Sequence, residues 1–139
     1  MSSSSRVLEL NRKVKGQMAS MNTLHLHKEN QVAYVAINRP PANALASELL
    51  QDLSSMLDTI EEQDDIRTVV LHGEGRFFSA GADIKEFTTV ESEEAFAQLS
   101  AKGQKLFERI ETFKKPVIAA IHGAALGGGL ELALSCHLR

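Results

Sequence analysis

The alternation of hydrophobic and polar positions predicts a β-hairpin at the start of the regular part of the chain. Residues 23–28 and 31–38 alternate or run apolar, and residues 29–30 stand between them as a turn. Pro40 then ends the second strand, because proline donates no amide to a sheet and the residue before it disfavours helix. We therefore expect two short antiparallel strands before the first helix.

Two longer stretches have the spacing of amphipathic helices. In the first, apolar side chains recur at helical intervals over Leu49–Ile60, with Ser47 as the expected N-cap and Glu48 at the positive end of the helix dipole. The second has the same periodicity over Phe96–Ile110, and a capping box at Thr88–Glu91 precedes it. Both patterns predict helices that bury one face.

Short apolar strands complete the order of the elements. Residues 68–72 and 117–121 are rich in β-branched and small apolar residues, which favours buried strands. A loop at 76–87 follows the first of them, and the triple glycine at 127–129 opens a third helix at Leu130. After the hairpin the order is helix, strand, helix, strand, helix, which predicts an α/β fold with parallel pairing.

Composition and charge limit the kind of protein. The chain has 139 residues, of which 43% are hydrophobic and 24% charged, so one soluble domain is expected. A net charge of -3 favours neither nucleic acid nor an anionic membrane surface as a partner, and no apolar run approaches the roughly 18 residues that span a bilayer. The single cysteine, Cys136, excludes an internal disulfide and fits a reducing, cytoplasmic setting. Inside the third helix and without a basic partner, Cys136 is predicted to be a small buried hydrophobe and not a nucleophile.

The first twenty residues differ from the rest. Residues 1–20 combine serines with basic side chains and lack the apolar region of a secretory signal. Three interpretations stay open: a weak organellar address, a vector-derived leader, or a start codon assigned too early, with Met18 or Met21 as the natural start. We therefore expect a disordered, tag-like extension at 1–20 and a domain at 21–139.

Two glycine-bearing loops, each directly after a predicted strand, are the candidates for chemistry. They cover residues 77–85 and 122–132. Ligands gather at the carboxyl ends of parallel strands, and small residues let a main-chain amide approach a ligand closely. An amide at a helix N-terminus also carries partial positive charge. Two such amides that converge would form an oxyanion hole.

Structural explanations of these loops remain open. Gly127, Gly128 and Gly129 would also allow tight packing of a helix on a sheet. A dinucleotide-binding turn lacks its third glycine, because Leu132 stands there, and no Gly-Lys-Ser/Thr follows as in a Walker loop. Glu131 would be the third helical residue if Gly128 were the N-cap, where capping alone favours an acid.

Other polar residues allow equally plain interpretations. Asp83 and Lys85 would serve as ordinary surface charges. The five histidines show no metal-ligand spacing, so no metal site is predicted.

Three motifs together resemble the enoyl-CoA hydratase/isomerase (crotonase) superfamily, and most closely the bacterial short-chain enoyl-CoA hydratases. The motifs are FSAGADIKE at 78–86, KPVIAAIHG at 115–123 and ALGGGLELA at 125–133. Residues 38–40 and 43–45 resemble the family's early segment, which helps to enclose coenzyme A. The resemblance covers nearly the whole chain, and motifs of this length in this order are specific.

The resemblance implies a fold and a set of site residues. The fold is a crotonase-like spiral of ββα units, incomplete in this chain. The main-chain amides of Ala82 and Gly128 would bind the thioester carbonyl oxygen, and Glu131 would be one of two catalytic glutamates. No metal and no cofactor is implied, since coenzyme A is part of the acyl-CoA substrate. Homotrimers or hexamers are the expected assemblies. The implied substrate-binding residues are Ala82, Asp83, Ile84, Lys85 and Gly128.

The implied activity is enoyl-CoA hydration in fatty acid β-oxidation, the reversible addition of water to a trans-2-enoyl-CoA. Another acyl-CoA reaction of the superfamily, by an isomerase, hydrolase or lyase, stays open, because the family's second acid/base residue falls beyond Arg139. The chain is therefore expected to be the N-terminal portion of the spiral. An inactive truncated fragment is the remaining alternative.

Overall fold

Two β-sheets organise the chain. The computed structural model describes residues 18–88 and 93–139, so the predicted capping box and most of the expected extension lie outside the described residues. The main sheet contains, in spatial order, β1 (Met18–Ser20), β2 (Leu24–Glu29), β3 (Val32–Ile37), β4 (Thr68–Gly73) and β6 (Val117–Ala120). The second sheet pairs β5 (Phe77–Ser79) with β7 (Ala124–Ala125).

Pairing changes from antiparallel to parallel across the main sheet. Strands β1, β2 and β3 pair antiparallel, whereas β3, β4 and β6 run parallel, as do β5 and β7. Met18–Ser20, which the sequence assigns to the extension, pairs with His25–His27 as the edge of the sheet. The main sheet therefore includes three residues that precede Met21.

The hairpin turn lies one residue later than the sequence predicts. Glu29 is the last residue of β2 and pairs with Val32, so Asn30 and Gln31 form the two-residue turn. Both have positive φ, at 50° and 67°. Two such residues give a tight turn whose twist matches that of the flanking strands. Asparagine often adopts positive φ, whereas glutamine rarely does, so the sequence gives no sign that Gln31 belongs to the turn.

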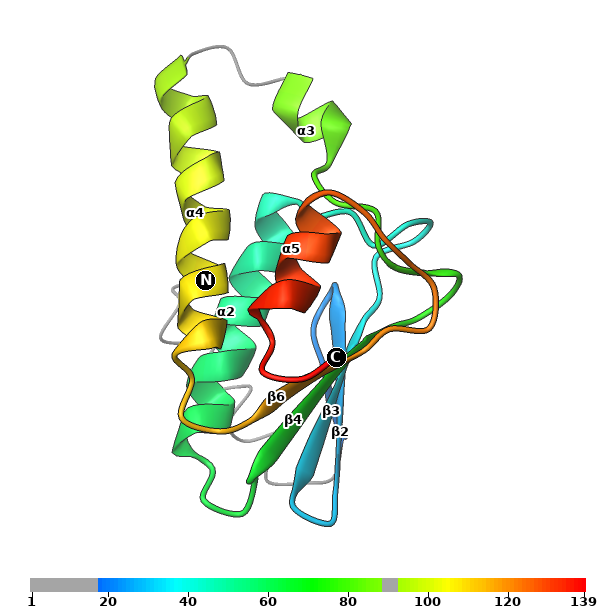
Figure 1. Ribbon diagram of the computed structural model, residues 1–139, viewed down its shortest axis with the longest axis vertical. Coiled ribbons are helices and arrows are strands. Elements are labelled where there is room, and N and C mark those ends of the chain that lie inside the picture. The colour runs from blue at the N-terminus through cyan, green and yellow to red at the C-terminus, as the bar shows by residue number, and fades with distance from the viewer. Residues whose placement is uncertain (1–17, 89–92) are drawn as a thin grey trace.

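All the long helices lie on one side of the main sheet (Figure 1). They are α2 (Ser47–Glu62), α4 (Glu93–Glu111) and α5 (Gly128–Ser135), and a short helix, α3 (Ile84–Thr88), precedes α4. The helical periodicities predicted for α2 and α4 are confirmed. Ala46, however, is the N-cap of α2, and the expected cap Ser47 is the first helical residue. Its amide and hydroxyl instead donate to the Glu86 carboxylate, which takes over the capping function.

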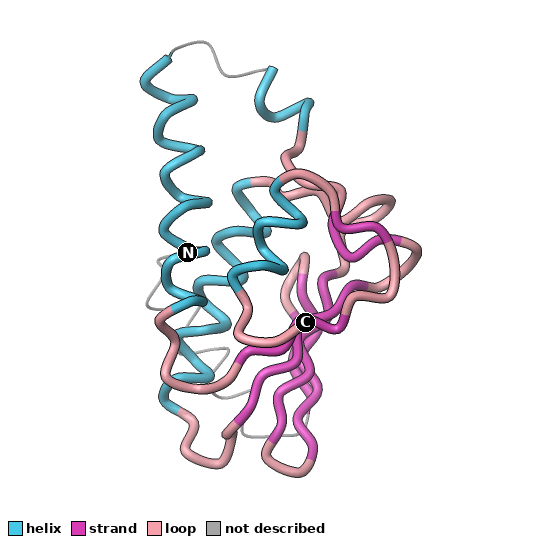
Figure 2. The backbone as a smooth tube through the Cα atoms, in the orientation of Figure 1, coloured by secondary structure: helices cyan, strands magenta, loops and turns pink. Residues whose placement is uncertain are grey.

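A repeat of two strands and a helix runs through the chain. The units are β2–β3–α2, then β4–β5 with α3 and α4, then β6–β7–α5. This order confirms the predicted α/β class and the incomplete ββα spiral. Strands β5 and β7 were not predicted, because they have only three and two residues and lie inside the glycine-bearing loops. Figure 2 shows that they stand apart from the main sheet.

The core fills the layer between the main sheet and the helices. Alternate residues of β2, β3 and β4 face this layer, and the opposite residues face outward. Helix α2 contributes the apolar face that its periodicity predicts. No helix among the described residues is long and apolar enough to cross a membrane. Fully buried side chains of the core include Leu24, Leu26, Ile37, Leu49, Met56, Ile60, Ile66, Phe78, Ile110 and Leu132.

Two polar contacts hold α2 at both ends of this layer. The buried Asp52 carboxylate accepts hydrogen bonds from the Thr23 hydroxyl at 2.7 Å and the Thr23 amide at 3.3 Å. At the other end Lys115 Nζ donates to the carbonyl oxygens of Ile60 at 2.5 Å and Gln63 at 2.7 Å. The Ile60 carbonyl oxygen also accepts the Gln63 amide at 3.1 Å, so the lysine adds a second donor at the C-terminus of the helix. Burial lowers the pKa of Lys115 below its ordinary value.

Candidate active site

The two glycine-bearing loops meet beside the N-terminus of α5. The Leu126 amide donates to the Ser79 carbonyl oxygen at 3.0 Å, which joins the loops directly. A methyl group built on Gly81 would lie 3.1 Å from the amide nitrogen of Gly128, and one built on Gly128 would lie 3.8 Å from the amide nitrogen of Ala82. The amides of Ala82 and Gly128 therefore come from distant segments and lie within a few ångströms of the same point.

Both amides are available for a ligand. In residues 18–88 and 93–139, neither the Ala82 nor the Gly128 N–H donates to a protein acceptor. Gly128 is the first residue of α5, where the N–H has no partner within the helix and the dipole adds partial positive charge. This pair can hold an oxygen atom that gains negative charge.

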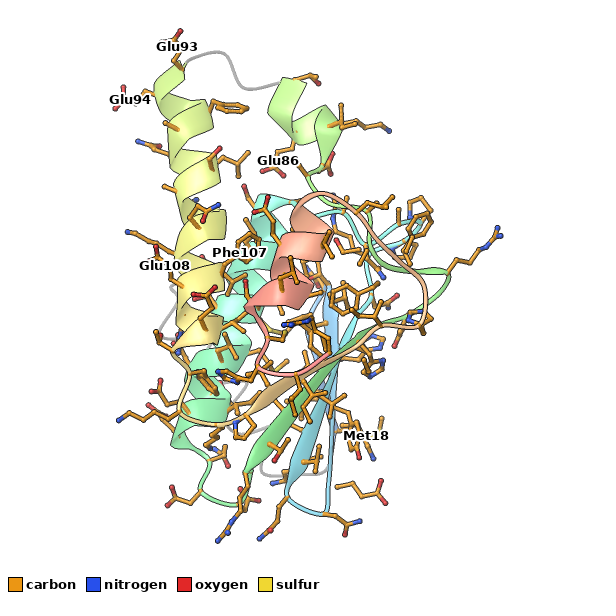
Figure 3. All side chains as sticks on the ribbon, in the orientation of Figure 1. Met18, Glu86, Glu93, Glu94, Phe107 and Glu108 are labelled. Atoms are coloured by element: carbon orange, nitrogen blue, oxygen red, sulfur yellow. The ribbon has the colours of Figure 1, made fainter. Side chains whose placement is uncertain are left out.

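A cavity of about 240 Å³ opens in front of these amides. It lies between α2, α4 and the N-terminal turn of α5, so helices from three parts of the chain enclose it. Figure 3 shows Phe107 pointing from α4 toward the other helices, whereas Glu108 lies on the outer side of α4. Three of the predicted site residues line the cavity, namely Ala82, Gly128 and Glu131. Its other lining residues are Leu45, Leu50, Leu99, Ser100, Gly103, Gln104 and Phe107.

Glu131 presents an exposed carboxylate to this cavity. Gly127 is the N-cap of α5, with φ at 50°, so Glu131 is the fourth helical residue and not the third. Its amide donates to the Gly127 carbonyl oxygen at 3.1 Å, as the amide of the fourth residue of an α-helix does. Its carboxylate makes no hydrogen bond or ion pair within the described part of the chain. The capping interpretation therefore has no contact to support it.

The segment after Ala82 turns away from the cavity. Asp83 accepts hydrogen bonds from the Glu86 amide at 3.2 Å and from Arg39 Nη2 at 2.8 Å. The bond from the Glu86 amide, followed by the contact with Arg39, lowers the pKa of the Asp83 carboxyl. Asp83 thus begins α3 and ties it to the segment before α2. Ile84, which is 75% exposed, and Lys85 follow on α3 and do not line the cavity.

The loop of Ala82 is held by Asn43, a residue that the sequence did not single out for this role. Asn43 is buried with φ at 55°, and its Nδ2 donates to the carbonyl oxygens of Glu74 at 3.1 Å and Phe77 at 2.9 Å. Ser79 Oγ donates to the Asn43 carbonyl oxygen at 2.8 Å and accepts the Gly81 amide at 3.2 Å. An asparagine shortly after two prolines indicates a turn, but these partners lie too far along the chain for any local pattern to reveal them.

Gly129 fixes how closely α5 approaches this loop. A methyl group at Gly129 would lie 2.2 Å from the Ser79 carbonyl oxygen, an overlap between two main chains that no side-chain rotation relieves. We expect Gly129→Ala to lower the free energy of unfolding by about 1–3 kcal/mol and to move the Gly128 amide. The matched control is Gly103→Ala, because no atom lies within 4 Å of that methyl position. It should raise stability by about 0.5–1 kcal/mol. Urea unfolding measures both, and equal shifts would contradict the packing argument.

Cys136 takes no part in the cavity. It is the C-cap of α5 and not an interior helical residue, it is buried, and its thiol faces the Leu132 carbonyl oxygen at 3.5 Å. Burial raises the pKa of the thiol to about 11. The thiolate, which is the reactive form, is therefore scarce at pH 8. We expect an aromatic disulfide reagent to label Cys136 slowly in the folded protein and rapidly in urea, and fast native labelling would show that the thiol is accessible.

No metal site emerges from the described residues, in which no group of three or more histidine, cysteine, aspartate or glutamate side chains has a suitable arrangement. The Nδ1 atom of His25 lies 3.0 Å from the Glu74 carboxylate, and His27 Nε2 lies 3.1 Å from that of Glu29. Both pairs are on the outer face of the main sheet, far from the cavity in the fold.

Comparison with known proteins places the chain in a family. Residues 27–139 match the sequence profile of the family described as enoyl-CoA hydratase/isomerase. A probable enoyl-CoA hydratase of Bacillus subtilis is 58% identical over 119 residues, which cover 86% of this chain and 46% of the relative. A short-chain-enoyl-CoA hydratase of Clostridium acetobutylicum is 44% identical over 124 residues, again 86% of this chain and 46% of the relative. The chain thus spans about half the length of these relatives.

Solved structures show the same fold. The enoyl-CoA hydratase of Bacillus anthracis superposes with a TM-score of 0.75 at 36% identity, over 89% of this chain and 46% of that one. Pseudomonas aeruginosa DspI superposes with a TM-score of 0.80 at 35% identity, over 86% of this chain and 49% of that one.

Proposed function

The chain belongs to the enoyl-CoA hydratase/isomerase family, and from this premise we propose that it supplies the thioester-binding half of an enoyl-CoA hydratase. The reaction is the reversible addition of water across the 2,3 double bond of a trans-2-enoyl-CoA, which gives a 3-hydroxyacyl-CoA. One observation carries the proposal: the amides of Ala82 and Gly128, which have no acceptor among the described residues, border the same cavity as the Glu131 carboxylate.

The amides would stabilise the charge that the reaction creates. Attack of water at the β-carbon moves electrons onto the thioester oxygen, and N–H groups fixed beforehand lower the energy of that state without reorganising. Losing one such donor raises a barrier by about 3–4 kcal/mol. This role explains why the loops have small residues at these positions, since main-chain groups do the binding.

Glu131 would act on the water. From the first turn of α5 its carboxylate can orient the water and accept its proton, or return a proton to the α-carbon. A second carboxylate is expected from a segment that follows the residues of this chain, because the matched relatives are about twice as long. Assembly into trimers or hexamers stays a prediction.

The coenzyme A portion would leave the cavity past α3. Ile84 and Lys85 are exposed on this short helix directly after the Ala82 amide, in a position to meet the nucleotide portion of the thioester. Asp83 would position them through its contacts with Arg39 and Glu86, not bind the substrate itself.

A chimera tests the proposal. Residues 21–139 would replace the matching half of the Clostridium acetobutylicum hydratase, and hydration of crotonyl-CoA would be followed by the loss of enoyl-CoA absorbance. We expect turnover by the chimera. The 139-residue chain would be tested for butyryl-CoA binding by calorimetry, with free coenzyme A as the control ligand. A folded chimera without turnover, together with a chain that binds butyryl-CoA no better than coenzyme A, would overturn the proposal.

A further inference from the structure

One glycine of the cavity wall lies in the middle of a long helix. Gly103 is the eleventh of the nineteen residues of α4 (Glu93–Glu111) and borders the cavity in front of Ala82 and Gly128. Leu99 and Phe107 stand four residues before and after it, on the same face, and both also border the cavity. Residues at this spacing form one row on a helix surface. The row thus has a large apolar side chain at each end and a notch at its centre.

Packing against the described residues does not account for this glycine. A methyl group built on Gly103 meets no atom within 4 Å among the described residues, whereas one on Gly129 would overlap the main chain of Ser79. Gly103 does not have a positive φ, so its backbone conformation does not require glycine either. A glycine inside a helix lowers stability relative to alanine. Among the described residues, the helix therefore keeps a less stable residue at a position where glycine leaves open volume in the cavity.

We propose that Gly103 sets the acyl chain length that the site accepts, an inference that rests on the proposed function. With the thioester oxygen held at Ala82 and Gly128, the notch between Leu99 and Phe107 admits the alkyl tail of the substrate. Each methylene that the tail buries there strengthens binding about fourfold. A side chain at position 103 would occupy the notch and remove this gain for long tails, while a short tail that stops before the notch would bind as before.

Gly103→Leu and a matched control test this assignment. Ala101→Leu adds the same side chain two residues away, on an exposed part of α4 that does not border the cavity. Dissociation constants of butyryl-CoA and octanoyl-CoA would be measured by calorimetry for both variants and for the unaltered chain. We expect Gly103→Leu to raise the dissociation constant of octanoyl-CoA at least tenfold and that of butyryl-CoA less than threefold. Gly103→Ala should give an intermediate loss for octanoyl-CoA with a raised melting temperature, and Ala101→Leu should change neither constant.

The outcomes separate the two proposals. Suppose that the unaltered chain binds both acyl-CoAs more tightly than coenzyme A, but Gly103→Leu leaves the ratio of the octanoyl-CoA and butyryl-CoA dissociation constants unchanged. The assignment of Gly103 is then wrong, and the proposed function stands. If Ala101→Leu changes the ratio of the two dissociation constants as strongly as Gly103→Leu does, the effect arises from the helix as a whole and not from the notch. That result also overturns the assignment. If the unaltered chain prefers neither acyl-CoA to coenzyme A, the proposed function fails first.

Discussion

Replacing Glu131 by glutamine is expected to lower kcat for crotonyl-CoA hydration by about 10²–10⁴-fold in the chimera, while the dissociation constant of butyryl-CoA stays within about twofold. Glutamine keeps the shape and hydrogen-bonding reach of glutamate but cannot take a proton from water. Binding should survive, because the amides of Ala82 and Gly128 and the walls of the cavity are unchanged. Stopped-flow absorbance gives kcat, and calorimetry gives the affinity.

The matched control is Glu108→Gln. Glu108 is an exposed acid on α4 that faces away from the cavity (Figure 3), so neither kcat nor affinity should change. If Glu131→Gln lowers the free energy of unfolding but not kcat, Glu131 stabilises the helix and has no catalytic role. Nothing in the contacts of its carboxylate favours that result, because no described residue pairs with it.

The sequence predicts α2 and α4 well because their signal is local, whereas the short helix α3 lies in the segment predicted as a loop. Leu49, Leu53 and Ile60 recur at the period of the helix that buries them, and all are buried in α2. The caps were harder to predict. Serine is a typical N-cap residue, yet the first amide of α2 donates to the Glu86 carboxylate, thirty-nine residues along the chain from Ser47. A capping contact made across the fold leaves no mark on the residues next to the helix.

The candidate site also contains residues that the sequence could predict and residues that it could not. Small residues near strand ends, with a helix after them, point to residues 77–85 and 122–132 as loops whose amides a ligand can approach. The family resemblance is what singles out the amides of Ala82 and Gly128 and the Glu131 carboxylate. The wall that α4 contributes could not be predicted, because helical periodicity shows that Leu99 and Phe107 share a face without showing what that face meets. Ile84 and Lys85 are adjacent to Ala82 in sequence, but they lie outside the cavity because α3 begins there, and their contact with the substrate stays a prediction.

The loop that carries the Ala82 amide depends on Asn43, and Asn43→Ala is therefore expected to lower the free energy of unfolding by about 2–5 kcal/mol. Each part-buried carbonyl that loses its donor costs about 0.5–1.5 kcal/mol, and alanine with positive φ costs about 1–2 kcal/mol more. Asn43 Nδ2 serves the carbonyl oxygens of Glu74 and Phe77, and its φ is 55°. Such a loss is a large share of a typical domain's stability, so the variant should unfold at much lower urea concentration.

Asn43→Gly separates the two causes. Glycine accepts the positive φ at no steric cost but cannot donate to the two carbonyls, so it should recover about 1 kcal/mol of the loss and no more. If the side-chain bonds hold the loop in place, both variants weaken butyryl-CoA binding even where they remain folded, because the Ala82 amide is no longer fixed opposite that of Gly128. Full recovery of stability and binding in Asn43→Gly would mean that backbone conformation alone, and not the hydrogen bonds, positions this half of the site.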